Sequence, residues 1–218
     1  MIEGRAKEIL RILRKTFASP KLPASDREPF KTLVVTIISQ NTAAGNTTRA
    51  FDNLSKRFKI EPEVLANAET SQIEECLKVG GLYRNKAKAI KQVSKTILED
   101  FQGDLKQILL LPFEDARKTL MQLPGVGPKT ADVVLLFSAH KQTIPVDTHV
   151  NRVSKRLGLV PAKGDYEAVR SALQFLFAPN DYLAVHILLI SHGRKYCKAR
   201  KPLCTHCPIS SLCPSKQL

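Results

Sequence analysis

The sequence predicts an all-α protein, and three observations support that fold class. Apolar residues recur at intervals of three and four along nearly the whole chain of 218 residues, as on a helix with one buried face. No segment alternates between apolar and polar residues as a half-buried strand does. Capping signals divide the chain into roughly ten short helices. We therefore expect helices packed on helices.

The first helix is expected at the N-terminus, in the segment IEGRAKEILRILRKTF. Its apolar residues share one face: Ile2, Ala6, Ile9, Leu13 and Phe17. Such a helix should pack on the body of the protein and does not resemble a signal peptide. No apolar run approaches the roughly 18 residues that a membrane span needs. We therefore expect an intracellular protein in a reducing compartment.

Two further apolar stripes mark the helices that follow. They comprise Phe30, Leu33, Val34, Ile37 and Ile38, and then Ile90, Val93, Ile97 and Leu98. Helix starts are indicated by Ser71 with Glu74, which fits a capping box, and by Asp165 and Asn180, which stand where N-caps are expected. The chain shows no internal repeat and no low-complexity tract.

The charge balance gives the first indication of function. The chain has 34 Lys and Arg against 20 Asp and Glu, which gives a net charge of +14 and a pI near 9.7. A protein this basic usually binds a polyanion, and nucleic acid is the commonest one. Charge alone is also compatible with a role in solubility only.

The stretch LPGVGPKT, residues 123–130, joins two helical patterns. Gly125 and Gly127 permit a positive φ and a close approach of the backbone, so amide groups can point outward together. Pro128 suits the first position of the following helix, where no amide donor is needed. Amides exposed at a helix N-terminus bind phosphate. In a basic protein, this helix, hairpin and helix predict binding to a nucleic-acid backbone.

Lys129 lies in the first turn of the second helix, where the helix dipole disfavours a cation. That position is expected to lower its pKa and to expose a neutral amine that can form a Schiff base. Asp147, in IPVDTHV, precedes a helix marked by Val150 and Val153. An ionised carboxylate there can stabilise developing positive charge. The simpler alternatives are that Lys129 only contacts a phosphate and Asp147 only caps its helix.

Four cysteines form a candidate metal site near the C-terminus, in CKARKPLCTHCPISSLC. They are Cys197, Cys204, Cys207 and Cys213. Such a cluster in a reducing compartment indicates a metal site and not disulfides. Structural zinc favours paired C-x2-4-C knuckles, and only Cys204 and Cys207 form such a pair, whereas four thiolates also suit a [4Fe-4S] cluster. The spacing leaves both open and favours iron–sulfur, with His206 as a bystander.

Lys198, Arg200 and Lys201 lie between the first two cysteines. A metal that fixes both ends of this loop would present three cations to DNA phosphates. Alternatively, the loop is solvated and offsets the negative charge of the thiolates. Cys76 stands alone in an apolar segment and is most simply a buried core thiol.

Together these segments resemble the endonuclease III branch of the helix-hairpin-helix DNA glycosylases. The likeness covers nearly the whole chain and rests on LPGVGPKTADVVL, PVDTHVNRVSKRLGL, HGRKYCKARKPLCTHCPISSLC, IISQNT and GLYRNKAKAI. The resemblance implies a [4Fe-4S] cluster on all four cysteines. It implies a two-lobed fold with DNA along the groove between the lobes. One lobe is a helical barrel of residues 21–135 that includes the hairpin, and the other joins residues 1–20 to residues 136–218, with the cluster loop at 197–213.

The resemblance also implies an activity: a bifunctional DNA glycosylase and abasic-site lyase that excises oxidised pyrimidines in base excision repair. Lys129 is then the nucleophile on the sugar C1′, and Asp147 stabilises the cationic transition state, before β-elimination nicks the strand. Gln40 and Leu82 match positions that fill the gap left by the flipped nucleotide. Taken alone, Gln40 is a helix-end polar residue and Leu82 a core leucine. His149, beside Asp147, is a further candidate DNA contact.

The implied partner is double-stranded DNA with a damaged pyrimidine or an abasic site, bound by a monomer in the cytoplasm with the nucleoid. Lys129 separates the chain from adenine-excising and thymine-mismatch relatives, which lack that lysine. Two departures concern DNA contacts: Ala43 stands where many bacterial members have Asp, and Pro128 where they often have a basic residue. The alternatives are a monofunctional glycosylase for a mismatched base and a non-catalytic module that binds DNA.

Overall fold

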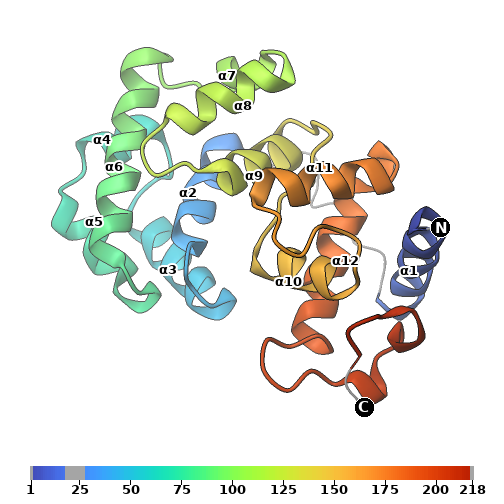
Figure 1. Cartoon of the computed structure of the whole chain (residues 1–218). Coiled ribbons are helices and arrows are strands. Elements are labelled where there is room, and N and C mark those ends of the chain that lie inside the picture. The colour runs from blue at the N-terminus through green and yellow to red at the C-terminus, as the bar shows by residue number, and fades with distance from the viewer. Residues whose placement is uncertain (1, 18–27, 217–218) are drawn as a thin grey trace. The chain divides into compact units, whose positions relative to one another are not determined.

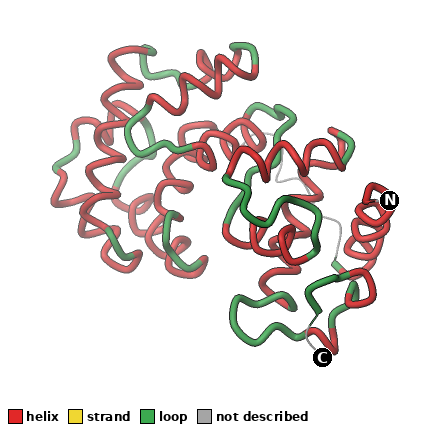
Figure 2. The backbone as a smooth tube through the Cα atoms, in the orientation of Figure 1, coloured by secondary structure: helices red, strands yellow, loops and turns green. Residues whose placement is uncertain are grey.

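The structure is a computed structural model that describes residues 2–17 and 28–216, and all regular elements in that part of the chain are helical. Twelve α-helices and four short 3-10 helices lie in these residues, and the backbone there contains no strand (Figures 1 and 2). The all-α fold expected from the sequence is confirmed.

One compact unit comprises the described residues 28–141. Its elements are α2 (Pro29–Ser39), α3 (Ala44–Arg57), α4 (Pro62–Asn67), α5 (Thr70–Leu77), η1 (Lys78–Gly80), α6 (Tyr83–Asp100), α7 (Lys106–Leu110), α8 (Phe113–Gln122) and α9 (Pro128–Ser138). Helix α2 is apolar on nearly every side and packs on α3, α6 and α9. Because α2 fills the centre of this unit, it fixes where the loops at its ends and the start of α9 lie.

The second unit combines residues 2–17 with residues 142–216. Its elements are α1 (Ile2–Thr16), α10 (Thr148–Arg156), α11 (Tyr166–Leu176), η2 (Pro179–Asp181), α12 (Tyr182–Lys195), η3 (Cys204–His206) and η4 (Ser210–Leu212). Helix α12 packs on α10 and α1. In the described residues no single helix is long and apolar enough to cross a membrane, although the bent pair 166–176 and 179–195 meets that test by length and composition.

The N-terminal helix carries the expected apolar face. Ala6, Ile9 and Leu13 are buried against the second unit, whereas Ile2 at the start of the helix is 43% exposed. The division expected between residues 135 and 136 falls inside α9, and the compact units divide after Lys141. The division expected after residue 20 lies outside the described residues, and the assignment of domains stays a prediction.

Of the three expected helix starts, one is correct. Asp165 caps α11, where its carboxylate accepts a hydrogen bond of 2.9 Å from the Ala168 amide. Ser71 does not cap α5, because the carbonyl of Glu69 already accepts the first bonds of that helix. Asn180 does not cap α12, because it lies within η2, which runs directly into that helix.

Candidate active site and metal centre

The hairpin between α8 and α9 uses its two glycines differently. Gly125 has φ +77°, and a Cβ atom there would lie 2.8 Å from the Cβ of Ala89 on α6, so only glycine fits. Gly127 has an extended backbone with φ −95° and no atom within 4 Å of its missing Cβ. Both glycines permit a positive φ, and only Gly125 adopts one. Pro128 begins α9, as expected.

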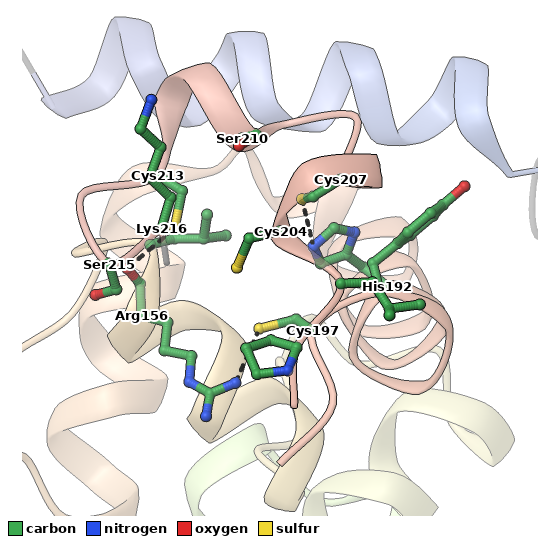
Figure 3. Close-up of a pocket in the computed structure, with 13 residues that line it drawn as sticks. Arg156, His192, Cys197, Cys204, Cys207, Ser210, Cys213, Ser215 and Lys216 are labelled. Atoms are coloured by element: carbon green, nitrogen blue, oxygen red, sulfur yellow. Dashed lines mark hydrogen bonds between the residues drawn. The ribbon is translucent and has the colours of Figure 1, made fainter. Parts of the chain in front are cut away.

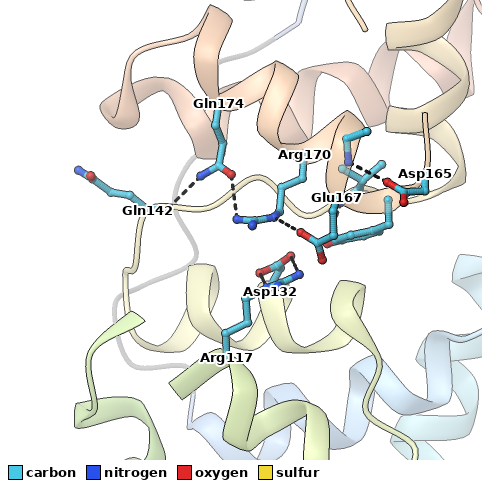
Figure 4. A network of polar contacts seen from close by, with 10 residues as sticks. Arg117, Asp132, Gln142, Asp165, Glu167, Arg170 and Gln174 are labelled. Carbon is cyan, nitrogen blue, oxygen red and sulfur yellow. Dashed lines mark hydrogen bonds and ion pairs between the residues drawn. The ribbon is translucent and has the colours of Figure 1, made fainter. Parts of the chain in front are cut away.

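A buried ion pair joins the two helices of this hairpin. The Nε atom of Arg117 on α8 donates to Oδ1 of Asp132 on α9 at 2.9 Å, and Nη2 donates to Oδ2 at 3.3 Å (Figure 4). The two side chains are 9% and 0% exposed. This pair was not predicted from the sequence. Its only signal is a charged residue within the apolar stripe of each helix.

Gln40 and Leu82 lie on turns of the same unit as the hairpin. At the end of α2, Nε2 of Gln40 donates to the carbonyl of Gly125 at 3.0 Å and to Oγ1 of Thr130 at 3.2 Å. Leu82 precedes α6 with φ +49° and is 58% exposed, so its interpretation as a core leucine is wrong. Ala43 is the N-cap of α3 and makes no side-chain capping bond.

Lys129 and Asp147 each stand at the start of a helix. Lys129 is the second residue of α9 and is half-buried. Asp147 caps α10, and its Oδ1 accepts a hydrogen bond of 2.7 Å from the amide of Val150. The capping alternative for Asp147 is therefore correct as a structural statement. The cap fixes the carboxylate at the positive end of the α10 dipole.

A pocket opens beside Asp147 within the second unit. Its lining includes Asn151 on α10 and, at the start of α11, Asp165 and Tyr166. The hydroxyl of Tyr166 accepts a hydrogen bond of 3.3 Å from the Val146 amide. The pocket thus places the Asn151 amide, one turn along α10, and the Tyr166 hydroxyl of α11 beside Asp147, and neither residue was singled out from the sequence.

His149 packs at the contact of α10 with α12. Its Nδ1 lies 3.0 Å from Nη2 of Arg152, which also donates to the carbonyl of Gly193 at 3.1 Å. Burial, more than any nearby charge, lowers the pKa of His149. Because a guanidinium can only donate, Nδ1 accepts and the imidazole is neutral, with its proton on Nε2.

The four cysteines line one pocket, as Figure 3 shows. Cys197 follows α12, Cys204 and Cys207 bound the short helix η3, and Cys213 follows η4. In the described part of the chain, no three His, Cys, Asp or Glu side chains are grouped to hold a single metal ion. Burial raises the pKa of the Cys207 and Cys213 thiols, so their thiolates need positive charge beside them. Four sulfurs around a shared space suit a cluster in which each iron takes one thiolate.

Two side chains of the second unit approach these sulfurs. Nη1 of Arg156 on α10 lies 3.5 Å from Sγ of Cys197, and Nε2 of His192 on α12 lies 3.6 Å from Sγ of Cys207. Burial lowers the pKa of His192 to about 4, so its ring is neutral at pH 7. His206 does not line the pocket, in agreement with the bystander role expected for it.

The basic loop that follows Cys197 is held from α10. Arg156 donates to the carbonyl of Lys198 at 2.7 Å and to that of Ala199 at 3.0 Å. Lys198, Arg200 and Lys201 are all exposed. The loop was expected to be fixed by the metal alone, and the part that Arg156 plays was not predicted.

An all-helical fold with a glycine hairpin between two helices and a four-thiol loop defines a helix-hairpin-helix DNA repair protein. The model described as HhH-GPD superfamily base excision DNA repair protein matches residues 34–179, and that of the iron–sulfur binding domain of endonuclease III matches residues 197–213. The endonuclease III of Sulfolobus acidocaldarius is 35% identical over 96% of this chain and 92% of its own length. That of Synechocystis is 36% identical over 98% and 93%.

The solved structure of a trapped endonuclease III–DNA covalent intermediate superposes with a TM-score of 0.86 at 29% identity, over 98% of this chain and 96% of that one. The chain belongs to the endonuclease III family of base excision repair proteins. It is a bifunctional DNA glycosylase and abasic-site lyase, it acts on DNA, and its cofactor is a [4Fe-4S] cluster. The monofunctional and non-catalytic alternatives are therefore set aside.

The cysteine pocket fits this cofactor, because four thiols and two nitrogen donors face one space. Cys197, Cys204, Cys207 and Cys213 would hold the cluster. When bound, it supplies a covalent cross-link between α12 and the short helices η3 and η4.

Proposed function

We propose that the enzyme excises oxidised pyrimidines from double-stranded DNA, with Lys129 as nucleophile and Asp147 as the stabilising carboxylate. The observation that carries the proposal is the position of Lys129 on the second residue of α9, directly after the glycine hairpin. A phosphate held by amides at that helix start places the amine within one helical turn of the DNA backbone.

The chemistry follows from an amine and a carboxylate acting on the sugar. Nζ of Lys129 attacks C1′, and the N-glycosidic bond breaks with its electron pair leaving on the base, which takes up a proton. The sugar ring opens to a Schiff base. Loss of a C2′ proton then expels the 3′ phosphate oxygen from C3′, which nicks the strand, and water releases the lysine. Asp147 stabilises the positive charge that develops at C1′.

Gln40 and Leu82 are proposed to fill the space that the flipped nucleotide leaves. Leu82 suits this role because an exposed apolar side chain can act as a wedge between base steps. Gln40 offers a polar group directly beside the hairpin. Flipping costs least for a damaged base that stacks poorly. Side chains that stabilise the gap therefore favour lesions over intact nucleotides.

The remaining contacts are proposed to hold the phosphate backbone. Gly125 and Gly127 present amides at the start of α9, and the exposed cations of the loop 198–201 provide a second region of positive charge. His149 would donate from Nε2, the nitrogen left free by Arg152. We further propose that the enzyme works as a monomer and is associated with the nucleoid in the cytoplasm.

Borohydride trapping tests the proposal on duplexes that carry thymine glycol, 8-oxoguanine or an abasic site. We expect a covalent adduct with thymine glycol and with the abasic site. Lys129→Ala should abolish it, whereas Lys118→Ala, which removes an exposed lysine of α8, should not. Asp147→Asn should slow excision on the order of a hundredfold. An adduct that persists in Lys129→Ala would overturn the nucleophile, and a preference for 8-oxoguanine would overturn the pyrimidine class.

A further inference from the structure

Lys86 on α6 is a buried lysine whose ammonium meets neutral oxygens. The side chain is 4% exposed. Its Nζ donates to the carbonyl of Gly80 at 3.0 Å and to the hydroxyl of Thr42. That hydroxyl donates in turn to the carbonyl of Gly80 at 2.6 Å. Lys86, Thr42 and Gly80 therefore form a closed triangle of hydrogen bonds, which we call the Lys86 clamp.

A buried ammonium is costly to desolvate, and burial lowers the pKa of Lys86. An apolar side chain of the same length would fill this position without that cost. The ammonium provides something that an apolar chain cannot, namely several donors that fan out from one atom toward different segments. The ammonium can therefore link two segments that an apolar side chain could not link.

The clamp joins two turns whose backbones are unusual. Thr42 ends the turn that carries Gln40, in which Asn41 has φ +52°. Gly80 precedes the turn that carries Leu82, whose φ of +49° is rare for a leucine. Such conformations persist where surrounding bonds over-determine them. The amide of Lys86 also donates to the carbonyl of Leu82 at 3.1 Å, so one residue holds both sides of the second turn.

The first turn is tied to the hairpin as well. Nε2 of Gln40 bonds to the Gly125 carbonyl and to the Thr130 hydroxyl, and Thr130 directly follows Lys129. A continuous chain of contacts therefore runs from the Leu82 turn, through the Lys86 clamp and Gln40, to the start of α9.

We propose that Lys86, acting with Thr42, is a positioning residue that holds Gln40 and Leu82 at a fixed separation, so that both enter the DNA gap together. This inference rests on the gap-filling roles given to Gln40 and Leu82 under the proposed function. The clamp matters most when a base must be extruded. It matters less on a preformed abasic site, which has no base to unstack.

The experiment compares two rates in each variant: excision of thymine glycol and cleavage of a preformed abasic site. Lys86→Met removes the ammonium, and Thr42→Val removes the hydroxyl while keeping its shape. Lys91→Met is the matched control, because Nζ of Lys91 on the same helix donates to the Ala68 carbonyl at 2.7 Å, away from both turns. Leu82→Ala reports on gap filling itself. The fluorescence of 2-aminopurine placed opposite the lesion reports unstacking directly.

We expect Lys86→Met and Thr42→Val to slow excision of thymine glycol on the order of tenfold, with abasic cleavage changed by less than about threefold. Both should weaken the 2-aminopurine signal, and Thr42→Ser should restore most of the rate lost in Thr42→Val. Lys91→Met should leave both rates and the signal near wild type. If Lys86→Met does not fold, Thr42→Val decides the question.

Three results would overturn parts of the proposal, and they are distinguishable. If Leu82→Ala shifts the ratio of the two rates but Lys86→Met and Thr42→Val do not, the positioning role of the Lys86 clamp is wrong and the proposed function stands. If Leu82→Ala also leaves the ratio unchanged, the gap-filling roles fail and the clamp fails with them. If the wild-type enzyme gives no borohydride adduct, the proposed chemistry itself fails.

Discussion

The hairpin of residues 123–127 and the cysteine loop of residues 197–213 are both proposed to meet DNA, but different forces hold their shapes. The hairpin stands between two full helices, α8 and α9, which the buried pair of Arg117 and Asp132 ties together. The cysteine loop has only the short helices η3 and η4. Its described bonds to other elements include those from Arg156 and from Arg5 of α1, which donates to the Leu212 carbonyl at 3.2 Å. The hairpin is thus fixed by its own packing, whereas we expect the loop to depend on its cofactor in addition to these bonds.

Removing the cofactor should have the largest effect and should separate the two regions. We expect Cys204→Ser to lose most of the iron, because a cluster of this type takes one thiolate per iron. Hydrogen exchange should then show lost protection throughout residues 197–213, while residues 113–138 stay protected. Iron content and visible absorbance measure the first effect, and exchange followed by mass spectrometry measures the second.

The matched control is Cys76→Ser, which alters the buried thiol of the other unit. It should retain full iron content. If the apo protein instead loses protection equally in the hairpin and in the loop, the difference drawn between the two regions is wrong.

Breaking the buried ion pair should weaken the hairpin and leave the cysteine loop intact. Arg117→Met removes the guanidinium from the buried Asp132 carboxylate, which should cost about 3–5 kcal/mol in the free energy of unfolding. Arg57→Met is the control, because its ion pair with Glu75 is largely exposed and should be worth no more than about 1 kcal/mol. Denaturant unfolding measures both. Similar losses from the two variants would show that burial of the pair contributes nothing.

Alanine substitutions at the two hairpin glycines should differ in how much stability they remove. Gly125→Ala forces an alanine into a left-handed backbone and against Ala89, so we expect a loss of about 1–2 kcal/mol or more. Gly127→Ala meets no atom and has an ordinary backbone, so stability should change by less than about 0.5 kcal/mol. If Gly127 serves DNA binding, its variant should still lose affinity for duplex DNA. Equal destabilisation by the two substitutions would contradict the difference in their backbones.

What the sequence predicted well was local. The buried face of α1 and the caps at Asp147 and Asp165 depend on residues within one or two turns, and the structure contains all three. Ser71 failed as a cap although its motif fits, because Glu69 is the N-cap and the helix begins two residues earlier than expected, at Thr70. The alternative interpretation of Leu82 as a core leucine also failed, since a left-handed residue that turns its side chain outward leaves no apolar pattern of its own.

What the sequence could not supply were partners that are distant along the chain. Arg156 reaches the loop 198–199 from α10, and Lys86 reaches Thr42 across more than forty positions. Each is a charged residue in a basic chain, and nothing in its neighbours separates it from a solvated lysine or arginine. Such residues are found only when the fold brings their acceptors into reach. The four cysteines were found because a rare residue type was clustered within one short segment.

The smallest effect concerns the exposed cations of the cysteine loop. Lys198 is exposed, and only its backbone is held by Arg156, so Lys198→Ala should leave unfolding unchanged. If its side chain meets a phosphate, duplex affinity should fall a few-fold and the slope of log K against log salt should flatten by about 1. Lys163→Ala, an exposed lysine elsewhere in the unit, should leave the slope unchanged.

The salt dependence of DNA binding also connects the small effect of Lys198→Ala to the large effect of losing the cluster. In apo Cys204→Ser the loop is no longer fixed at both ends, so Lys198, Arg200 and Lys201 should lose their contacts together. The salt slope should then flatten by more than any single lysine variant produces, and adding Lys198→Ala to the apo protein should change it little further. If the effects of Cys204→Ser and Lys198→Ala on the salt slope simply add, the loop presents its cations without the cluster. The cofactor would then be unnecessary for DNA binding by this loop.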